Sequence, residues 1–246
     1  MTPPMILEGR TALVTGASRG LGRAIAGALA ARGAAVACVA RDGAELESSV
    51  AALRGGGARV LAVPADVTRA TEVEAAVRAT VAQLGGLDIV VLNAGTWLGA
   101  PVHETTEETW DRLLDLNLKG AFLAVKYTLP HLLERRRGTI VGICSLGGWV
   151  GQPGSAAYAA SKWGLRGLLE SVALEVKPAG VRVSIVSPHN INSAGRTIDP
   201  GSDERRHKLE PSEIADLVAH ICSAPDHVSI GNVTIWPVGA GIRSEG

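Results

Sequence analysis

The stretch "TALVTGASRGLG", residues 11–22, decides the fold of this chain. A short apolar run leads directly into a segment in which Gly16, Gly20 and Gly22 precede a helix pattern. Glycines between a strand and a helix allow a tight turn and let backbone N–H groups approach a pyrophosphate at the helix N-terminus. The spacing here is G-x3-G-x-G, which differs from the usual dinucleotide-binding G-x-G-x-x-G. Taken alone, the glycines fit either a phosphate-binding loop or a purely structural turn.

Short apolar runs alternate with longer helix patterns along the rest of the chain. The predicted strands cover 10–15, 35–40, 58–63, 87–92, 138–144, 181–187 and 230–236. The helix patterns cover 21–32, 43–54, 69–84, 106–135, 155–177 and 211–223. Most of the strand runs are continuously apolar, which is typical of strands buried on both faces of a parallel sheet. We therefore predict an α/β fold of Rossmann type, a doubly wound, seven-stranded parallel sheet with helices on both faces.

No linker, repeat or low-complexity tract divides the chain, so residues 1–246 are predicted to form a single catalytic domain. The one long irregular piece is 188–210, and its part 194–210 is a candidate substrate lid. Residues 194–208 carry a charged cluster and few apolar side chains, so we expect them to be mobile until ligands bind. Ser212 is the predicted N-cap of the last helix.

Composition excludes several classes of protein. Lys plus Arg and Asp plus Glu number 24 each, which gives no support for nucleic acid or an anionic membrane as a partner. The N-terminal residues do not form a signal peptide, and no apolar run is long enough to span a membrane. Cys38, Cys144 and Cys222 lie far apart in apolar segments, which predicts reduced core residues and a cytoplasmic protein.

The segment "GSAAYAASKWG", residues 154–164, places a phenol and an ammonium in an apolar surrounding. Lys162 follows Tyr158 at a spacing that puts both side chains on one face of a helix. A free tyrosine has a pKa of about 10, a poor match for proton transfer near pH 7. A neighbouring cation lowers that pKa, so we expect Lys162 to activate Tyr158 as an acid and base. Read singly, Lys162 could also be a solvated surface charge.

The glycine loop, the tripeptide Asn93-Ala94-Gly95 and Tyr158-x3-Lys162 together resemble the short-chain dehydrogenase/reductase family. The motifs follow the family's order and spacing, and the resemblance covers essentially the whole chain. It implies a Rossmann sheet that binds NAD or NADP. Within the family, the chain is similar to 3-oxoacyl-carrier-protein reductases, and its segment "SAPDHVSIGNVTIWP", residues 223–237, resembles 3-hydroxy-acid dehydrogenases.

The resemblance also implies a catalytic set of four residues: Asn117, Ser145, Tyr158 and Lys162. Ser145 holds the family's position for a serine that hydrogen-bonds the substrate carbonyl. Asn117 holds the position of an asparagine that supports a water relay to the lysine. The oxidised nicotinamide would add a second cation that stabilises the phenolate of Tyr158.

The second predicted strand bears on the choice of nucleotide. In Rossmann folds an acid at its end binds the ribose 2′-OH, while an arginine nearby accommodates a 2′-phosphate. Ala40 stands in the acid's place, Arg41 follows it, and Arg19 lies in the glycine loop. Two guanidiniums can meet a phosphate through forked hydrogen bonds. Asp42 is the opposing observation, but it comes late and could instead cap the next helix. We predict NADP (NADPH), with NAD less favoured.

The predicted cofactor-binding residues are Gly16, Ser18, Arg19, Gly20, Leu21, Gly22, Arg41, Asp66, Val67, Asn93, Ala94, Gly95, Tyr158, Lys162, Pro188, Ile191 and Ser193, and no metal site is predicted. The resemblance suggests that Asp66 lies near the adenine; from sequence alone it could equally begin a helix.

The main departure from the family follows the sixth predicted strand. The family usually has Pro-Gly there, whereas this chain has Pro188-His189. His189 could be a polar group that faces the substrate or a surface replacement for glycine. If the backbone at this position needs a positive φ, His189 would be strained. Trp97 and Trp149 could line the pocket or pack in the core or an interface.

These observations predict an NADP(H)-dependent oxidoreductase that transfers hydride between the nicotinamide and a ketone or secondary alcohol. The alternative is a non-catalytic NADP-sensing or scaffold protein on the same fold.

The two helix patterns on either side of the fifth predicted strand carry more apolar residues than one apolar stripe needs. This surplus predicts a homo-oligomer, a dimer or tetramer. These residues are Leu113, Leu116, Phe122, Leu123, Trp163, Leu165, Leu168, Leu169, Val172, Leu174 and Val176.

Overall fold

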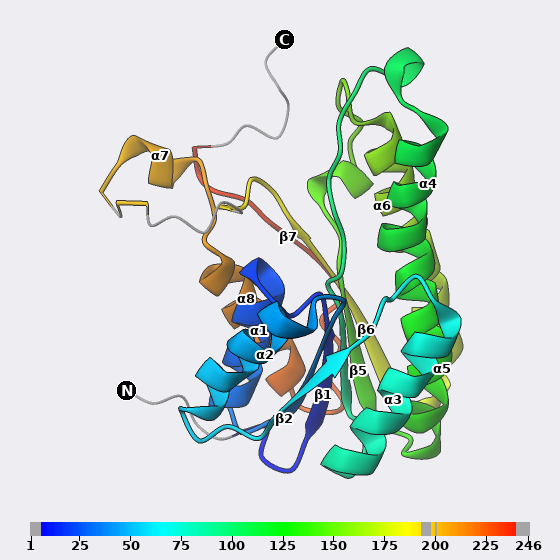
Figure 1. The fold of residues 1–246 in the computed structure, drawn as a ribbon, viewed down its shortest axis with the longest axis vertical. Coiled ribbons are helices and arrows are strands. Elements are labelled where there is room, and N and C mark those ends of the chain that lie inside the picture. Colours follow the sequence, from blue (N-terminus) through cyan, green and yellow to red (C-terminus); the bar gives the residue numbers. More distant parts are fainter. Residues whose placement is uncertain (1–5, 193–197, 200, 240–246) are drawn as a thin grey trace.

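The computed structural model describes residues 6–192, 198–199 and 201–239 (Figure 1). Within these residues, seven parallel strands form one sheet in the order β3-β2-β1-β4-β5-β6-β7. The strands are β1 Thr11–Thr15, β2 Ala35–Ala40, β3 Val60–Pro64, β4 Ile89–Leu92, β5 Gly138–Ile143, β6 Val181–Pro188 and β7 Asn232–Ile235. The predicted seven-stranded Rossmann-type sheet is therefore confirmed, and each strand lies within about two residues of its predicted bounds.

Helices cover both faces of the sheet (Figure 1). They are α1 Gly20–Ala31, α2 Gly43–Arg54, α3 Ala70–Leu84, α4 Glu107–Leu114, α5 Gly120–Glu134, α6 Ala156–Val176, α7 Asp203–Arg206 and α8 Pro211–Ser223. Helices α1, α2 and α8 pack on one face, and α3, α5 and α6 pack on the other. Buried side chains that mark these layers are Ile25, Leu46 and Ile214 on the first face and Val73, Leu132 and Leu169 on the second.

Local sequence predicted the N-cap residue correctly for helix α2 but not for helix α8. Asp42 caps α2 by accepting a hydrogen bond from the Glu45 backbone N–H at 3.0 Å, as the alternative for Asp42 proposed. The prediction that Ser212 caps α8 is wrong. Pro211 occupies the first helical position, where its missing N–H costs nothing, so the cap falls on Glu210, which forms a reciprocal capping box with Glu213.

The described part of the irregular piece 188–210 contains some regular structure, and its predicted mobility stays a prediction. The short helix α7 lies inside it, with Ser202 as its N-cap. Ile198 and Leu209 are both buried, and Leu209 forms a parallel bridge with Ile191. These apolar contacts fasten the described part of the segment to the body of the protein, although residues 193–197 and 200 lie outside the described residues.

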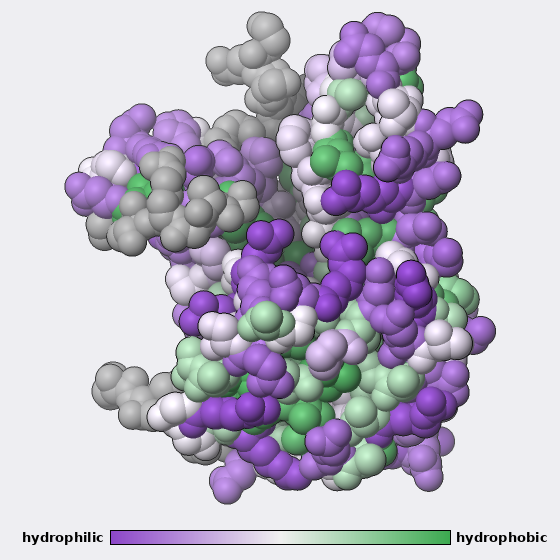
Figure 2. Space-filling model, viewed as in Figure 1, coloured by the Kyte–Doolittle hydropathy of each residue, from purple (hydrophilic) through white to green (hydrophobic). Residues whose placement is uncertain are grey.

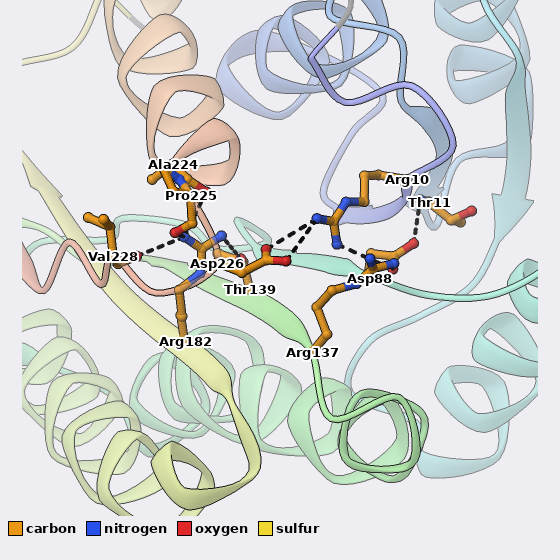
Figure 3. A network of polar contacts seen from close by, with 10 residues as sticks. All are labelled: Arg10, Thr11, Asp88, Arg137, Thr139, Arg182, Ala224, Pro225, Asp226 and Val228. Carbon is orange, nitrogen blue, oxygen red and sulfur yellow. Dashed lines mark hydrogen bonds and ion pairs between the residues drawn. The ribbon is translucent and has the colours of Figure 1, made fainter.

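A polar network joins the amino-terminal ends of the central strands (Figure 3). The carboxylate of Asp88 is 2% exposed and accepts hydrogen bonds from the Thr11 backbone N–H at 2.9 Å and from Arg137 at 3.0 Å. Arg10 lies 3.8 Å from Asp88 and 3.1 Å from Asp226, and so joins the two acids. The network ties β1, β4 and β5 together at the edge of the sheet opposite the carboxyl ends of the strands.

No helix in the described part of the chain is long and apolar enough to cross a membrane. Cys38, Cys144 and Cys222 are free and buried, as their apolar surroundings predicted. Burial raises the pKa of Cys38 and of Cys222 to about 12, so both stay thiols at neutral pH. The cytoplasmic location inferred from these cysteines stays a prediction.

Candidate active site

The carboxyl ends of β1 and β4 open into a cleft of about 770 Å³. These two strands are neighbours, and the sheet order reverses between them, which is where open α/β sheets bind ligands. Figure 2 shows the surface hollowed between the segment that carries α7 and the helices α4 and α6. The predicted cofactor residues that line the cleft are Gly16, Ser18, Arg19, Leu21, Gly22, Arg41, Val67, Asn93, Ala94 and Gly95.

The glycine loop needs its glycines for space and for backbone conformation. Gly16 and Gly20 have φ values of +66° and +52°, a region that side chains disfavour. A Cβ atom on Gly22 would overlap the carbonyl oxygen of Gly16. The Asn93 amide donates to the carbonyls of Thr15 at 3.0 Å and Gly16 at 3.2 Å. Asn93 therefore holds the loop, and its side chain is committed to that task.

Thr15 is a residue of this loop that sequence reasoning missed. Its hydroxyl accepts hydrogen bonds from the backbone N–H groups of Asn93 and Ala94, both at 3.0 Å, and so joins the ends of β1 and β4. Its donor partner is the Val91 carbonyl at 3.3 Å. The available signal was a hydroxyl at the last position of β1, directly before Gly16.

Two arginines stand at the end of the cleft beside β2. Arg19 and Arg41 are both exposed, and within the described residues neither guanidinium makes an ion pair or a hydrogen bond. Ala40 ends β2 where a ribose-binding acid would stand. The nearest acid on α2 that lines the cleft, Glu45, accepts a hydrogen bond from Ser18 at 2.7 Å. Two cations without an ion pair in the described residues thus line the same cleft.

Asp66 follows β3 and is engaged with its own turn. Its carboxylate accepts from the Thr68 backbone N–H at 2.9 Å and from the Thr68 hydroxyl at 2.8 Å. Burial opposes its ionisation, but these hydrogen bonds and the charges of Arg41 and Arg69 outweigh burial and lower its pKa. The Asp66 side chain thus forms the turn before α3, which was one of the two interpretations of the sequence. The other interpretation, a contact with adenine, stays a prediction.

The residues predicted to be catalytic converge beside Gly95, at the end of β4. Tyr158 and Lys162 lie one turn apart on α6, and the ammonium is 5.9 Å from the centre of the phenol ring. Lys162 is buried and donates to the Ile143 carbonyl at 3.0 Å. Ser145 follows β5 and hydrogen-bonds with Tyr158. The loop after β5 and helix α6 therefore bring a hydroxyl, a phenol and an ammonium together.

Burial dominates the acidity of this group. It raises the pKa of Tyr158, and the hydrogen bond with Ser145 only partly offsets the rise. Burial also lowers the pKa of Lys162. The protein by itself therefore does not show the lowered phenol pKa that the spacing predicted, because the ammonium turns to the Ile143 carbonyl and both groups are withdrawn from water. A raised pKa makes the phenol a weaker acid than free tyrosine, so burial by itself does not tune it for proton transfer near pH 7.

Asn117 lies in a π-helical turn, Asp115–Lys119, that splits the helix predicted over 106–135 into α4 and α5. Its amide is buried; its oxygen accepts from the Thr96 backbone N–H at 2.8 Å, and its nitrogen donates to the Thr96 carbonyl at 3.0 Å. One extra residue in the turn points this side chain inward against the loop after β4. Periodicity could not predict it, because the flanking apolar pattern is helical on both sides.

Ser161 also belongs to the site and was missed. It is fully buried, accepts from the Asn117 amide at 3.0 Å and donates to the Tyr158 carbonyl at 2.7 Å. It therefore couples the orientation of Asn117 to the first turns of α6. Its place directly before Lys162 was the only sequence signal.

The remaining predicted residues lie around the end of β6. Pro188 ends that strand and Ile191 follows it, whereas Ser193 lies outside the described residues. His189 does not have a positive φ; Asn190 does, at 54°, so the conditional expectation of strain at His189 is not met. Trp149 is partly buried, and its indole N–H donates to the Ser187 hydroxyl at 2.9 Å, while Trp97 is 60% exposed.

The fold and this group of residues define a Rossmann-type oxidoreductase. The family model described as short chain dehydrogenase matches residues 10–199, and the chain belongs to the short-chain dehydrogenase/reductase family.

Relatives span almost the whole chain. An uncharacterised oxidoreductase of Staphylococcus aureus is 33% identical over 95% of this chain and 99% of its own length. The crystal structure of a metagenomic short-chain oxidoreductase in complex with NADP is 36% identical, with a TM-score of 0.83 over 94% of this chain and 98% of that one. An alcohol dehydrogenase from the archaeon Thermococcus sibiricus, complexed with 5-hydroxy-NADP, is 30% identical, with a TM-score of 0.87 over the same shares of both chains.

Proposed function

We propose that this oxidoreductase transfers hydride between NADP(H) and a ketone or secondary alcohol, with Tyr158 as the acid and base. The observation that carries the proposal is the convergence of Ser145, Tyr158 and Lys162 next to a cleft lined by the glycine loop. Two structural relatives that are complexed with NADP or 5-hydroxy-NADP support the choice of cofactor.

The residues of the cleft fit a dinucleotide. The glycine loop offers a cradle that a Cβ atom on Gly22 would fill, and it opens the N-terminus of α1, where backbone N–H groups favour a pyrophosphate. Arg19 and Arg41 would hold the 2′-phosphate, and Pro188 and Ile191, with Ser193, the nicotinamide end. When bound, the cofactor supplies or accepts the hydride.

The chain's own residues position the substrate and move its proton. The Ser145 hydroxyl would donate a hydrogen bond to the substrate carbonyl oxygen and hold it against Tyr158. The Tyr158 phenol, which is protonated at neutral pH, would give its proton to that oxygen in reduction and regain it in oxidation. Lys162 supplies the nearby positive charge, and Asn117 fixes the loop after β4 that borders both.

The direct test is consumption of NADPH, followed by absorbance, with a panel of ketones that differ in size and polarity. Turnover of at least one ketone is expected. A protein that binds NADPH and turns over none of them would favour the alternative of a non-catalytic sensor or scaffold.

Arg41→Ala should weaken NADPH much more than NADH, because only NADPH carries the 2′-phosphate. Loss of charge-assisted hydrogen bonds of about 1.5–3 kcal/mol each predicts a rise of at least about tenfold in the Kd of NADPH. Fluorescence titration of both nucleotides measures the effect. Arg78→Ala, an exposed arginine on α3 paired with Glu74, is the matched control and should change neither Kd. Equal weakening of both nucleotides, or a wild-type preference for NADH, contradicts the assignment.

We propose that the protein is a homo-oligomer through α4, α5 and α6. Several residues of the predicted apolar surplus, such as Leu113, Leu123 and Leu165, are buried in the core. Large apolar side chains nevertheless remain exposed on these helices: Trp110 41%, Phe122 44%, Trp163 49% and Leu174 76%. Apolar surface on neighbouring helices marks a contact with another chain.

Light scattering at micromolar concentration should give the mass of a dimer or tetramer. Phe122→Asp should lower that mass, because it places a charge in the contact. Val102→Asp, at an equally apolar residue that is 71% exposed but outside these helices, should not. A monomeric wild type contradicts the proposal.

We also propose that 194–210 serves as a substrate lid, since it directly follows the residues after β6 that would hold the nicotinamide. Closure would exclude water and strengthen the contact between Tyr158 and the carbonyl. Hydrogen exchange of the amides in 201–210 should slow when NADP and a substrate analogue are added together, while amides in α3, far from the cleft, should not change. Unchanged exchange in 201–210 with both ligands bound identifies the segment as an ordinary surface loop.

A further inference from the structure

His189 directly follows Pro188, the last residue of β6. In the pairing of β6 with β7, Pro188 stands opposite Ile235, and the His189 backbone N–H continues the ladder by donating to the Ile235 carbonyl at 2.9 Å. The chain turns only at Asn190, which takes the left-handed conformation with φ of 54°. His189 therefore keeps the alternation of the strand that precedes it.

This alternation places His189 on the same face of the sheet as Ser187, because side chains two residues apart in a strand share a face. The Ser187 hydroxyl accepts from the indole N–H of Trp149 at 2.9 Å. Trp149 in turn packs on the Arg166 guanidinium of α6 at 3.5 Å from the ring centre. This is the face on which the loop after β5 and helix α6 carry Ser145 and Tyr158. His189 lies two residues beyond Ser187, at the carboxyl edge of the sheet.

The imidazole of His189 has no committed partner. It is partly buried, and within the described part of the chain its ring makes no hydrogen bond or ion pair. Burial lowers its pKa, so the ring is neutral at pH 7 and offers one donor and one acceptor. A partly buried ring whose polar atoms have no partner in the described protein can offer its donor and acceptor to a ligand. No residue of the proposed proton transfer uses it.

We propose that His189 determines specificity by hydrogen-bonding a second oxygen of the substrate, adjacent to the carbonyl that reacts at Tyr158. The preferred substrates are then ketones with a neighbouring hydroxyl group rather than simple ketones of the same size. This rests on the proposed function, since it concerns the same site. A site built to hydrogen-bond a substrate hydroxyl discriminates against an analogue that lacks it, because its own polar group is then left unpaired.

The test compares acetoin with butanone, which differ by one hydroxyl, as substrates for the wild type and two variants with NADPH. His189→Phe fills a similar volume without hydrogen-bonding groups, and its ratio of kcat/KM for acetoin over butanone should fall about tenfold. His189→Gln keeps a donor and an acceptor and should retain most of the ratio. The Kd of NADPH should be the same for all three proteins, which also shows that they are folded.

An unchanged ratio in His189→Phe overturns the inference and leaves the proposed function intact. A wild type that reduces neither compound nor any ketone of the panel contradicts the proposed function instead. In that case the affinities of the two compounds test the role of His189. Acetoin should quench the tryptophan fluorescence of the NADP-loaded wild type at a lower concentration than butanone, because Trp149 lies on the same face of the sheet as His189. Equal affinities for the two compounds in wild type and His189→Phe overturn the inference independently of turnover.

Discussion

Tyr158→Phe should lower kcat for carbonyl reduction by at least about 100-fold, the contribution of one general acid. The substitution removes only the phenolic oxygen, which hydrogen-bonds with Ser145 and is the proposed donor to the substrate. The ring, which lies against Gly147, stays in place, so the walls of the site keep their shape. Steady-state kinetics with NADPH and the best ketone of the panel measure the loss.

The chain contains its own control for this experiment. Tyr127, the only other tyrosine, lies on α5 with the ammonium of Lys126 at 5.5 Å from its ring centre, a pair that resembles Tyr158 and Lys162 but lies away from the cleft. Tyr127→Phe should leave kcat unchanged. The Kd of NADPH should be unchanged in both variants. Near-wild-type turnover in Tyr158→Phe would remove Tyr158 from the mechanism, whatever the cofactor assignment.

Asp88→Ala should lower the free energy of unfolding by about 3 kcal/mol, because it deletes a buried carboxylate and leaves its hydrogen-bond donors unpaired. The donors are the Thr11 backbone N–H and Arg137, and Arg10 also lies within 4 Å (Figure 3). Arg135 lies 3.9 Å from the same carboxylate. The loss of stability is smaller than for a fully buried ion pair, because the arginines reach solvent and water can solvate them. For a chain of this size the melting temperature should fall by about 6–12 °C, measured by calorimetry or circular dichroism.

Asp226→Ala separates the effect of burial from that of charge. Asp226 also pairs with Arg10, at 3.1 Å, but its side chain is 56% exposed, so its loss should cost no more than about 1 kcal/mol. Since the network lies at the edge of the sheet opposite the cleft, kcat of Asp88→Ala should be preserved well below its melting temperature. Equal stability of the two variants would show that the network contributes no more than surface ion pairs.

Local sequence was sufficient for the architecture of this protein. Continuous apolar runs such as Val36–Val39 can be buried on both faces only in a sheet covered by helices, so the order of runs and helix patterns specified a parallel sheet. The glycines at 16, 20 and 22 and the spacing of Tyr158 and Lys162 are likewise local, because a turn conformation and a helix face depend on residues close in sequence. Family resemblance added Ser145 and Asn117, whose places in the site no spacing could supply.

Contacts between distant segments decided the rest. Asn117, in the π-helical turn, hydrogen-bonds with Thr96 and Ser161, which are distant in sequence. The Thr15 hydroxyl hydrogen-bonds the end of β4 and so joins two strands that are far apart in sequence. The raised pKa of Tyr158 depends on how much of α6 and the loop after β5 cover the phenol, which periodicity does not encode. The direction of His189 likewise follows from its ladder bond to Ile235. Sequence patterns report which residues lie near one another along the chain, whereas burial, partners and acidity are set by atoms that only the tertiary structure brings within reach.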